Sequence, residues 1–154
     1  MPTFTIRQLG PNDVPSMRGM LQLFGRAFDE PDTYRGPGTP WLERLLGSET
    51  FIAIAALEGD EVIGGLAAYE LIKFEQERSE IYIYDLAVAE EHRRRGVATA
   101  MIRELQRIAA ERTAWVIFVQ ADHGDDPAIA LYMNLGARED VLHFDIPVPG
   151  AQQR

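Results

Sequence analysis

Apolar and polar residues alternate along the chain in a pattern that predicts strands and helices in close succession. Residues 3–7 alternate strictly and predict a short strand with one buried face. A helix is predicted over residues 13–28, with Asp13 as its N-cap, because apolar residues recur there at every third or fourth position. The stretch 29–38, which contains prolines and glycines, predicts a loop, and a second short helix follows over residues 39–47.

The rest of the chain alternates between strands and helices. Strands are predicted over residues 50–57, 61–69, 80–88, 115–121 and 139–146, with a charged loop at 73–79. Helices are predicted over residues 95–111 and from Asp126, the expected N-cap, to Gly136. This order predicts an α+β fold with a mixed sheet of about six strands. We expect a single domain over residues 1–147 and a loose C-terminal tail at 148–154.

The strand predicted over residues 80–88 carries unusual side chains. One face holds Glu80, Tyr82, Tyr84 and Leu86, and the other holds Ile81, Ile83 and Asp85, unless a β-bulge shifts the register. Carboxylates in an otherwise apolar strand are poorly explained as surface charges. Glu80 and Asp85 are therefore candidates for a functional role.

Composition and charge narrow the possible functions. The 154 residues are 46% hydrophobic and 25% charged, as in a folded domain, and 15 Lys and Arg against 24 Asp and Glu give a net charge of −9. Such a surface repels nucleic acid and anionic lipid and attracts polycations. No apolar run approaches the roughly 20 residues of a membrane span, and the first residues do not resemble a signal peptide. The absence of cysteine excludes disulfides and covalent cysteine catalysis. We therefore expect a cytoplasmic enzyme.

A basic stretch at residues 92–99 is the strongest candidate for a binding site. Gly96 and Ala98 lack bulky side chains where a helix begins, so backbone N–H groups can close around an anion. The helix dipole adds about half a positive charge at the same place. A pyrophosphate fits this cradle. Taken alone, the stretch is better explained as a basic helix start whose small residues serve packing, because short glycine motifs are common.

Two spaced motifs resemble those of the GCN5-related N-acetyltransferases (GNAT), which use acetyl-coenzyme A. The first, Arg93-x-x-Gly96-x-Ala98, is similar to the phosphate loop of that family. The second, Asp125-x-x-Ala128-x-x-Leu131-Tyr132-x-x-x-Gly136, has Asp125 where the family usually has Asn. The resemblance implies a mostly antiparallel sheet flanked by four helices, with acetyl-coenzyme A as acetyl donor.

Longer runs resemble the type I aminoglycoside 3-N-acetyltransferases. They are FEQERSEIYIYDLAV at 74–88, EHRR at 91–94, VQADHGDDPA at 119–128 and HFDI at 143–146. The resemblance implies acetylation of the 3-amino group of the 2-deoxystreptamine ring in antibiotics such as gentamicin, and hence antibiotic resistance. The acidic balance agrees independently, because aminoglycosides are polycations.

Roles for individual residues follow from the resemblance. With no cysteine, direct transfer in a ternary complex is expected, with Tyr132 protonating the leaving sulfur. Asp85 is the first choice for the base, with Glu80 and Tyr84 as alternatives. Cofactor binding is expected from Leu86, Ala87, Val88, Arg93, Arg94, Arg95, Gly96, Val97, Ala98, Thr99, Asp125, Ala128 and Tyr132. Substrate binding is expected from Asp29, Glu30, Glu75, Glu80, Tyr82, Asp122, His123 and Asp125.

Two other functions remain open: acetylation of another small amine or a protein N-terminus, and a non-catalytic acetyl-coenzyme A-binding module. No metal is expected, because no pair of histidines has ligand spacing with a third partner. We assign His92 a packing or surface role. Prolines at 147 and 149 stop strand pairing and would leave an exposed edge near Leu142, Phe144 and Ile146. A homodimer is therefore expected.

Overall fold

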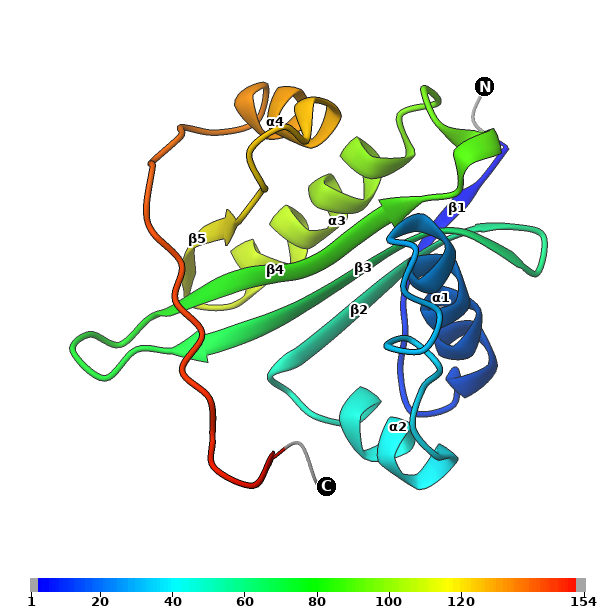
Figure 1. The fold of residues 1–154 in the computed structure, drawn as a ribbon, viewed down its shortest axis with the longest axis horizontal. Helices are drawn as coiled ribbons and strands as arrows, with labels where there is room; N and C mark the ends of the chain where they lie inside the picture. The colour runs from blue at the N-terminus through cyan, green and yellow to red at the C-terminus, as the bar shows by residue number, and fades with distance from the viewer. Residues whose placement is uncertain (1–2, 152–154) are drawn as a thin grey trace. The chain divides into compact units, whose positions relative to one another are not determined.

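The computed structural model describes residues 3–151, which contain five strands, four α-helices and a short 3-10 turn (Figure 1). The order of these elements agrees with the pattern in the sequence. In chain order they are β1 (Thr5–Gln8), α1 (Val14–Ala27), α2 (Thr39–Leu46), β2 (Phe51–Glu58), β3 (Glu61–Ile72), β4 (Ser79–Val88), η1 (Glu90–His92), α3 (Val97–Glu111), β5 (Ala114–Val119) and α4 (Asp126–Met133).

The chain divides at residue 120 into two compact units. The first unit contains the whole sheet, in the order β1-β2-β3-β4-β5, together with α1, α2 and α3. Three strand pairs are antiparallel, and the last pair, β4 with β5, is parallel. The expected mixed and mostly antiparallel sheet is therefore confirmed, as is its α+β class. The parallel pair requires a crossover, which α3 supplies.

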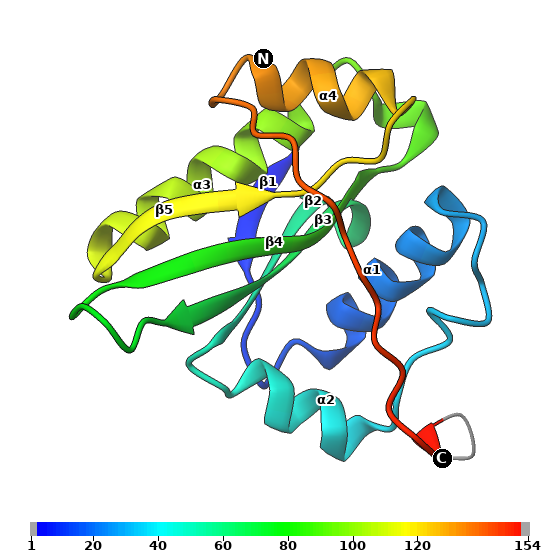
Figure 2. The ribbon, with the colours of Figure 1, turned by 60° about the vertical axis from the view of Figure 1, so that its left-hand side comes forward.

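The core of the first unit has two layers, one on each face of the sheet. Helices α1 and α2 cover one face and α3 covers the other (Figure 2). Consecutive glycines in the central strand β3 allow both helices to approach. A Cβ on Gly64 would lie 2.9 Å from a methyl of Val97 in α3, and a Cβ on Gly65 would lie 2.3 Å from Met20 in α1. Because neighbouring strand residues point to opposite faces, Gly64 and Gly65 leave room for a helix on each side of the sheet at its centre.

The second unit contains α4 and the residues that follow it. The expected N-cap at Asp126 is wrong, because Asp125 is the cap and its carboxylate accepts a hydrogen bond from the N–H of Ala128 at 3.4 Å. Asp126 is instead the first helical residue, with Pro127 behind it. The helix ends at Met133 with Asn134 as its C-cap, which is earlier than the predicted stop at Gly136, and the N–H of Gly136 donates to the carbonyl of Tyr132 at 2.9 Å.

The sixth strand expected over residues 139–146 is not formed, and the estimate of about six strands becomes five in the described part of the chain. The alternation of side chains is present there, but a strand also needs a neighbour for its N–H and C=O groups. Leu142, Phe144 and Ile146 remain 83%, 77% and 86% exposed. An apolar alternation alone did not suffice to predict pairing.

Two helix starts also differ in detail from expectation. Asp13 occupies the N-cap position of α1, but its carboxylate accepts from the N–H of Gly10 at 2.7 Å and pairs with Arg7 at 3.1 Å. Helix α3 begins at Val97 rather than Arg95, because Gly96 at its N-cap has a φ of +78°. Among the described helices, none is both long enough and apolar enough to span a bilayer.

Candidate active site

The carboxyl-terminal half of β4 lies beside an opening in the sheet. The parallel ladder between β4 and β5 ends at Ile83 opposite Val119, whereas β4 continues to Val88 along β3. Within residues 3–151, no strand therefore lies against the outer edge of residues 84–88. Alternate backbone groups of Leu86, Ala87 and Val88 face this opening, where an extended ligand could add like a strand.

A β-bulge in β4 determines which face the acidic residue of this half occupies. Ala68 lies opposite Ile83 but Ala67 lies opposite Asp85, so Tyr84 is an extra residue. The shift places Asp85 on the face of Tyr82 and Glu80, which is the face covered by α1. The simple alternation, which assigned Asp85 to the face of Ile81 and Ile83, is thus overruled by the bulge that we allowed for.

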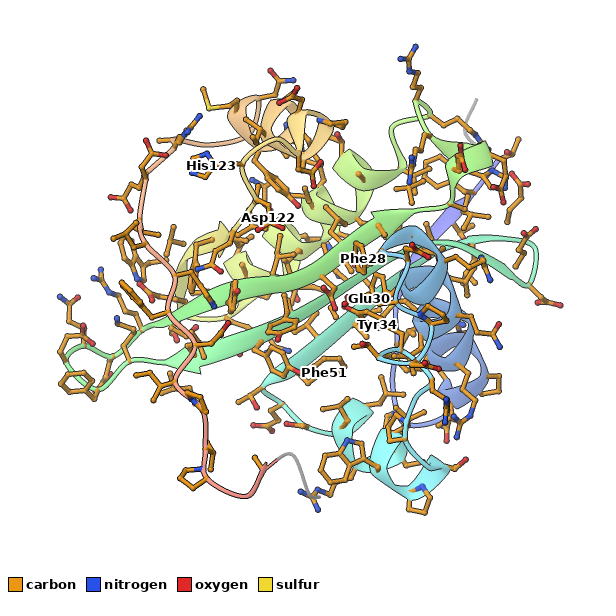
Figure 3. All side chains as sticks on the ribbon, viewed as in Figure 1. Phe28, Glu30, Tyr34, Phe51, Asp122 and His123 are labelled. Carbon is orange, nitrogen blue, oxygen red and sulfur yellow. The ribbon has the colours of Figure 1, made fainter. Side chains whose placement is uncertain are left out.

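Asp85 is held by the loop between α1 and α2. The hydroxyl of Tyr34 donates a hydrogen bond of 2.8 Å to Oδ2 of Asp85. Burial raises the pKa of Asp85 above its ordinary value, the Tyr34 hydrogen bond lowers it, and the charge of Glu30 raises it again. Phe28, Glu30 and Tyr34 lie together where this loop meets the sheet (Figure 3). The site therefore contains a partly buried carboxylate with a second acidic group beside it.

A row of aromatic rings continues from Asp85 across the same face of the sheet. Tyr69 of β3 packs edge-on against Tyr84 at 5.9 Å, and Tyr82 lies 5.8 Å from Tyr84. Tyr82 in turn stacks on Phe118 of β5 at 4.8 Å. Tyr84 is 60% exposed. Such rings can contact sugar rings and ammonium groups, so the row forms a possible floor for a cationic carbohydrate.

The other acidic residue of β4, Glu80, has different surroundings. Lys73, the only lysine in the sequence, lies 3.6 Å from Glu80 and 3.2 Å from Glu75. Glu80 and Asp85 are five positions apart along β4, which corresponds to about 16 Å of extended strand. The charge of Glu30 therefore acts on Asp85, whereas Glu75 and Glu80 form a separate group neutralised in part by Lys73. Asp29, with a φ of +54°, lies in the α1–α2 loop beside Glu30.

The candidate phosphate loop leads from η1 into α3. No side chain in the described chain caps this helix, and its N-cap Gly96 has a φ of +78°. The first-turn N–H groups at Val97, Ala98 and Thr99 have no acceptors within the helix, as at any helix start. A Cβ built on Gly96 meets no atom within 4 Å. The residues thus fit an anion such as a pyrophosphate, because the loop offers unpaired donors beside open space.

The arginines of this loop have unequal roles. The guanidinium of Arg95 is bound to the Glu58 carboxylate at 3.0 Å and also donates to Thr3 and His92. Arg93 donates through Nε to the carbonyl of Val88 at 3.3 Å, which ties the loop to the end of β4. Arg94 has a φ of +65°. Arg95 is therefore mainly structural, and its expected cofactor contact is limited to the backbone.

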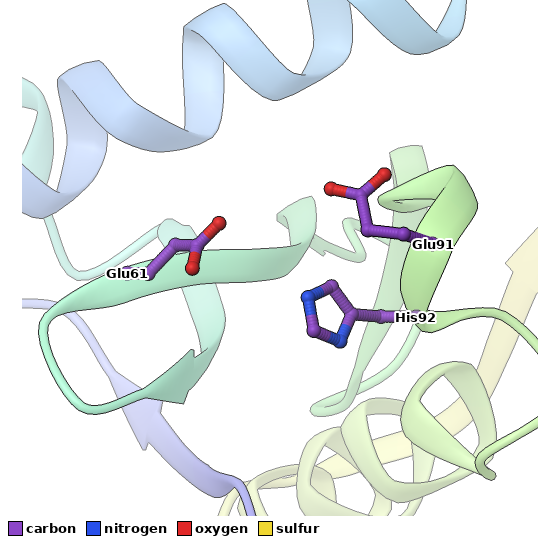
Figure 4. A group of neighbouring side chains, drawn as sticks. All are labelled: Glu61, Glu91 and His92. Atoms are coloured by element: carbon purple, nitrogen blue, oxygen red, sulfur yellow. The ribbon is translucent and has the colours of Figure 1, made fainter.

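His92 belongs to a group that has the composition of a metal site. Ligand atoms of Glu61, Glu91 and His92 lie within 4.8 Å of one another (Figure 4). The two carboxylates are exposed, and the Arg95 guanidinium is bound to Nδ1 of His92. A cation bound to these ligands would be repelled by that guanidinium.

The second unit carries the remaining predicted residues. Asp125 caps α4 and Ala128 donates to it, and Tyr132 follows one turn later on the same helix. Burial and the charge of Asp125 raise the pKa of Tyr132 to about 12. Asp122 and His123, labelled in Figure 3, are exposed residues ahead of α4. Tyr132 therefore carries its proton at neutral pH, as a proton donor must.

Tyr34 and Tyr69 are the site residues that sequence reasoning missed. Tyr34 lies in a polar loop between Pro31 and Gly36, where no periodicity marks it, and its partner is 51 residues away. Tyr69 was placed at the end of a strand without a role. A signal for Tyr69 existed, because an aromatic residue opposite Tyr82 in adjacent strands forms a cross-strand pair.

Comparison with known proteins identifies the family to which this fold belongs. Residues 17–137 match the Acetyltransferase (GNAT) family. The chain belongs to this family. Family membership supports acetyl-coenzyme A as the acetyl donor.

Solved structures of aminoglycoside acetyltransferases are similar over nearly the whole chain. One, from an uncultured soil metagenomic sample, is 59% identical, with a TM-score of 0.93, over 96% of this chain and 99% of that one. A second, also from an uncultured soil metagenomic sample and in complex with sisomicin, is 30% identical, with a TM-score of 0.89, over 95% and 97% of the two chains. The chain is thus a GNAT protein that resembles aminoglycoside acetyltransferases.

Curated relatives are more distant. A mycothiol acetyltransferase of Kocuria rhizophila is 33% identical over 103 residues, which are 64% of this chain and 31% of that protein. The chain spans only about a third to under half of the length of the curated relatives it matches.

Proposed function

We propose that this protein transfers the acetyl group of acetyl-coenzyme A to the 3-amino group of the 2-deoxystreptamine ring of gentamicin-type aminoglycosides, which confers resistance to them. The observation that carries the proposal is the 59% identity with an aminoglycoside acetyltransferase over 96% of the chain. The choice of the 3-amino group rests on the sequence runs that resemble the type I family.

Charge and shape support a polycationic substrate. The net charge of −9 concentrates cations near the protein. Asp85 and Glu30 place two carboxylates together, and the tyrosine row beside them offers ring faces to sugars and ammonium groups. We assign Asp29, Glu30, Glu75, Glu80, Tyr82, Asp122, His123 and Asp125 to substrate binding, with Glu30 as the most central of them.

We assign the acetyl donor to the opening beside β4 and to the loop that follows. Leu86, Ala87 and Val88 would pair with its pantetheine arm and orient the thioester carbonyl. The N–H groups from Arg94 to Thr99 would bind its pyrophosphate, with Gly96 leaving room for close approach. Arg93, Asp125 and Ala128 would complete the contacts.

Two proton transfers are needed at neutral pH. In the proposed reaction Asp85 accepts a proton from the substrate ammonium, directly or through a water, and the neutral amine then attacks the thioester carbonyl. Glu80 and Tyr84 remain alternatives. Glu80 is the weaker one, because Lys73 already binds it. Tyr132 donates its proton to the departing sulfur.

A turnover assay tests the proposal. The protein is incubated with acetyl-coenzyme A and, separately, gentamicin, sisomicin, a polyamine and a peptide with a free N-terminus, and the released thiol is measured. We expect turnover with the aminoglycosides and an acetyl group on the 3-amino nitrogen by NMR. Acetylation of another amine would overturn the regiochemistry, and turnover only with the polyamine or peptide would overturn the substrate class.

The role of Tyr132 is tested by Tyr132→Phe. This change removes only the proton-donating hydroxyl, so turnover should fall about 10²-fold or more while affinity for acetyl-coenzyme A stays constant. Calorimetry of donor binding and steady-state kinetics measure the two effects. An unchanged rate would show that water protonates the thiolate.

We also propose that the protein is a homodimer. Exposed apolar side chains gather in the C-terminal stretch, with Leu142, Phe144 and Ile146 more than three-quarters exposed. A partner chain would bury them at a gain of about 25 cal/mol per Å². Light scattering should give about twice the chain mass of 17.3 kDa. A value near one chain mass at micromolar concentration would refute the dimer.

The remaining expectations stay predictions of the same proposal. They are a cytoplasmic location, a single domain over residues 1–147 with a tail after it, and independence from metal. Residues 152–154 of that tail lie outside the described residues. Cell fractionation tests the location, and limited proteolysis tests the domain and its tail. Turnover measured after treatment with a metal chelator tests the independence from metal.

A further inference from the structure

The hydrogen bond between Tyr34 and Asp85 joins a surface loop to the middle of the sheet. The Tyr34 hydroxyl lies 2.8 Å from Oδ2 of Asp85, while the other carboxylate oxygen, Oδ1, is not engaged by it. Asp85 follows the bulge residue Tyr84, where β4 is no longer paired with β5. The bond therefore fixes the carboxylate at the place where the sheet opens.

The ring of Tyr34 is itself firmly placed. Its centroid lies 5.7 Å from that of Phe24 and 5.6 Å from that of Phe28, and these two rings stack on each other at 5.6 Å. Ring pairs of this kind are attractive beyond simple burial. The hydroxyl thus projects from a rigid aromatic cluster rather than from a mobile loop.

Gly25 allows the loop to return onto α1. A Cβ at this position would lie 3.3 Å from Cα of Pro31 and 3.5 Å from Cβ of Tyr34. The N–H of Glu30 donates to the carbonyl of Gly25 at 2.9 Å, and the N–H of Tyr34 donates to the carbonyl of Glu30 at 3.2 Å. The same short segment therefore carries both Tyr34 and Glu30 to Asp85.

The groups around Asp85 include one charged residue, Glu30, which favours the protonated form of the carboxyl, together with neutral tyrosines. Glu30 comes from the loop, Tyr69 from β3, and Tyr82 and Tyr84 from β4, while α1 contributes the apolar rings of its last two turns. Burial and the negative charge of Glu30 raise the pKa of Asp85, and the hydrogen bond from Tyr34 is the interaction that lowers it.

We propose that Tyr34 is a positioning residue that keeps the Asp85 carboxylate ionised and oriented, with Oδ1 directed at the substrate amine, and that brings Glu30 beside it as a second anchor for the ammonium group. This inference rests on the proposed role of Asp85 as the base. Tyr34 is assigned no proton transfer, because its hydroxyl proton is engaged in the hydrogen bond to Asp85.

The test compares Tyr34→Phe with Tyr69→Phe in the full-length protein. Both changes remove one phenolic hydroxyl from the same face of the sheet, but the Tyr69 hydroxyl has no hydrogen bond to Asp85 among the described residues. The first readout is the ¹³C NMR titration of the Asp85 carboxyl, and the second is the pH profile of kcat/KM with gentamicin.

In Tyr34→Phe we expect the carboxyl titration and the acid limb of the profile to move together to higher pH. On the acid side kcat/KM should fall about tenfold, because hydrogen bonds to charged groups are typically of that strength, and it should recover in part at higher pH. Tyr69→Phe should leave the position of the limb unchanged. An unmoved titration in Tyr34→Phe would overturn the proposal, whatever the change in kcat/KM.

The outcomes also separate this inference from the assigned function. If the carboxyl titration moves in Tyr34→Phe but the rate profile does not follow, then Tyr34 controls Asp85 and the assignment of Asp85 as base is what fails. If Tyr34→Phe does not fold, 3-fluorotyrosine placed at position 34 retains the ring and strengthens the donor. The titration of Asp85 should then move to lower pH, and a titration that stays in place would refute the proposal.

Discussion

The two ends of β4 carry carboxylates in opposite environments. Glu80 lies at the amino end, where β4 is paired on both sides: Leu71 of β3 and Val116 of β5 lie opposite it. Its carboxylate forms an ion pair with Lys73. Asp85, near the carboxyl end, has a strand on one side only, no ion pair among the described residues, and a tyrosine hydroxyl as its donor.

The difference between the two carboxylates indicates which surroundings favour the proposed role of a strand residue as a base. At the amino end the charge is compensated, so Glu80 gains little from meeting a further cation. At the carboxyl end, β4 has a bulge and is no longer paired with β5. The Asp85 carboxylate there accepts a hydrogen bond from the neutral Tyr34 hydroxyl and experiences the negative charge of Glu30. A substrate ammonium is the group that compensates this arrangement, which is why function is expected at this end.

The largest expected effect separates the two carboxylates directly. Asp85→Asn should reduce turnover by about 10²–10⁴-fold, because the base is lost, and should also weaken aminoglycoside binding. Glu80→Gln, the matched control on the same strand face, should change turnover by only a fewfold. Steady-state kinetics with gentamicin measure both. If only Glu80→Gln is impaired, the base lies at the amino end, and if neither is, solvent deprotonates the amine.

A second comparison concerns the loop into which the carboxyl end of β4 runs. Gly96→Val should weaken binding of acetyl-coenzyme A by about tenfold or more, since the left-handed backbone disfavours a side chain by roughly 1–2 kcal/mol and the new methyls occupy the anion cradle. Gly59→Val is the control, because Gly59 has a φ of +62° and also meets no atom within 4 Å.

Calorimetry and thermal unfolding of these two variants give the answer. Both should lose similar stability, but only Gly96→Val should lose affinity. Equal affinity in both folded variants would place the pyrophosphate elsewhere.

A smaller effect is expected at the amino end. Lys73→Met removes the counter-ion of Glu75 and Glu80, so the KM for aminoglycosides should fall by about two- to fivefold, as expected for pairs of roughly 0.2–1 kcal/mol. The effect should shrink in high salt. Arg107→Met on α3 changes the net charge equally and serves as control. A fall in KM for both variants would indicate long-range attraction rather than contact.

The smallest effects concern stability. Burial raises the pKa of Asp85, so the folded state binds its proton more tightly than the unfolded chain. The protonated Asp85 carboxyl therefore contributes to stability at pH values below its pKa in the unfolded chain. That contribution is lost as the pH rises through its pKa in the folded protein. Asp85→Asn should therefore raise the Tm at neutral pH, whereas Glu80→Gln should lower stability by at most about 1 kcal/mol. A Tm of Asp85→Asn that falls like that of Glu80→Gln would contradict the comparison.

Most of the fold could be predicted because its helices, strands and turns produce patterns in short stretches of the sequence. The turn at Gly59, the continuous apolar run of β2 and the alternation along β4 specify the antiparallel strands, and the apolar spacing specifies α1 and α3. Asp85 could be identified because a carboxylate in an apolar strand needs an explanation. The strand expected over residues 139–146 failed because pairing depends on a neighbour that the pattern does not encode.

Tyr34 and the bulge at Tyr84 could not be predicted for a related reason. The hydrogen bond of Tyr34 spans 51 residues, and its geometry depends on how Gly25 lets the loop return. The bulge is evident only in the pairing of β3 with β4, where Ala68 lies opposite Ile83 and Ala67 opposite Asp85. Contacts between distant segments determine the chemistry of this site, and they leave no periodic signal.

The parallel pairing of β4 with β5 has a consequence for the order in which the molecule folds. The β2–β3 hairpin closes between Glu58 and Glu61, whereas Ser79 of β4 pairs with Ala114 of β5 beyond α3, so we expect the β4–β5 pair to form later. Contacts of long sequence separation form late, because loop closure costs entropy before it is rewarded. We therefore expect the antiparallel strands β2, β3 and β4 to form a scaffold first. The opening beside Asp85 is complete only once β5 has joined the sheet.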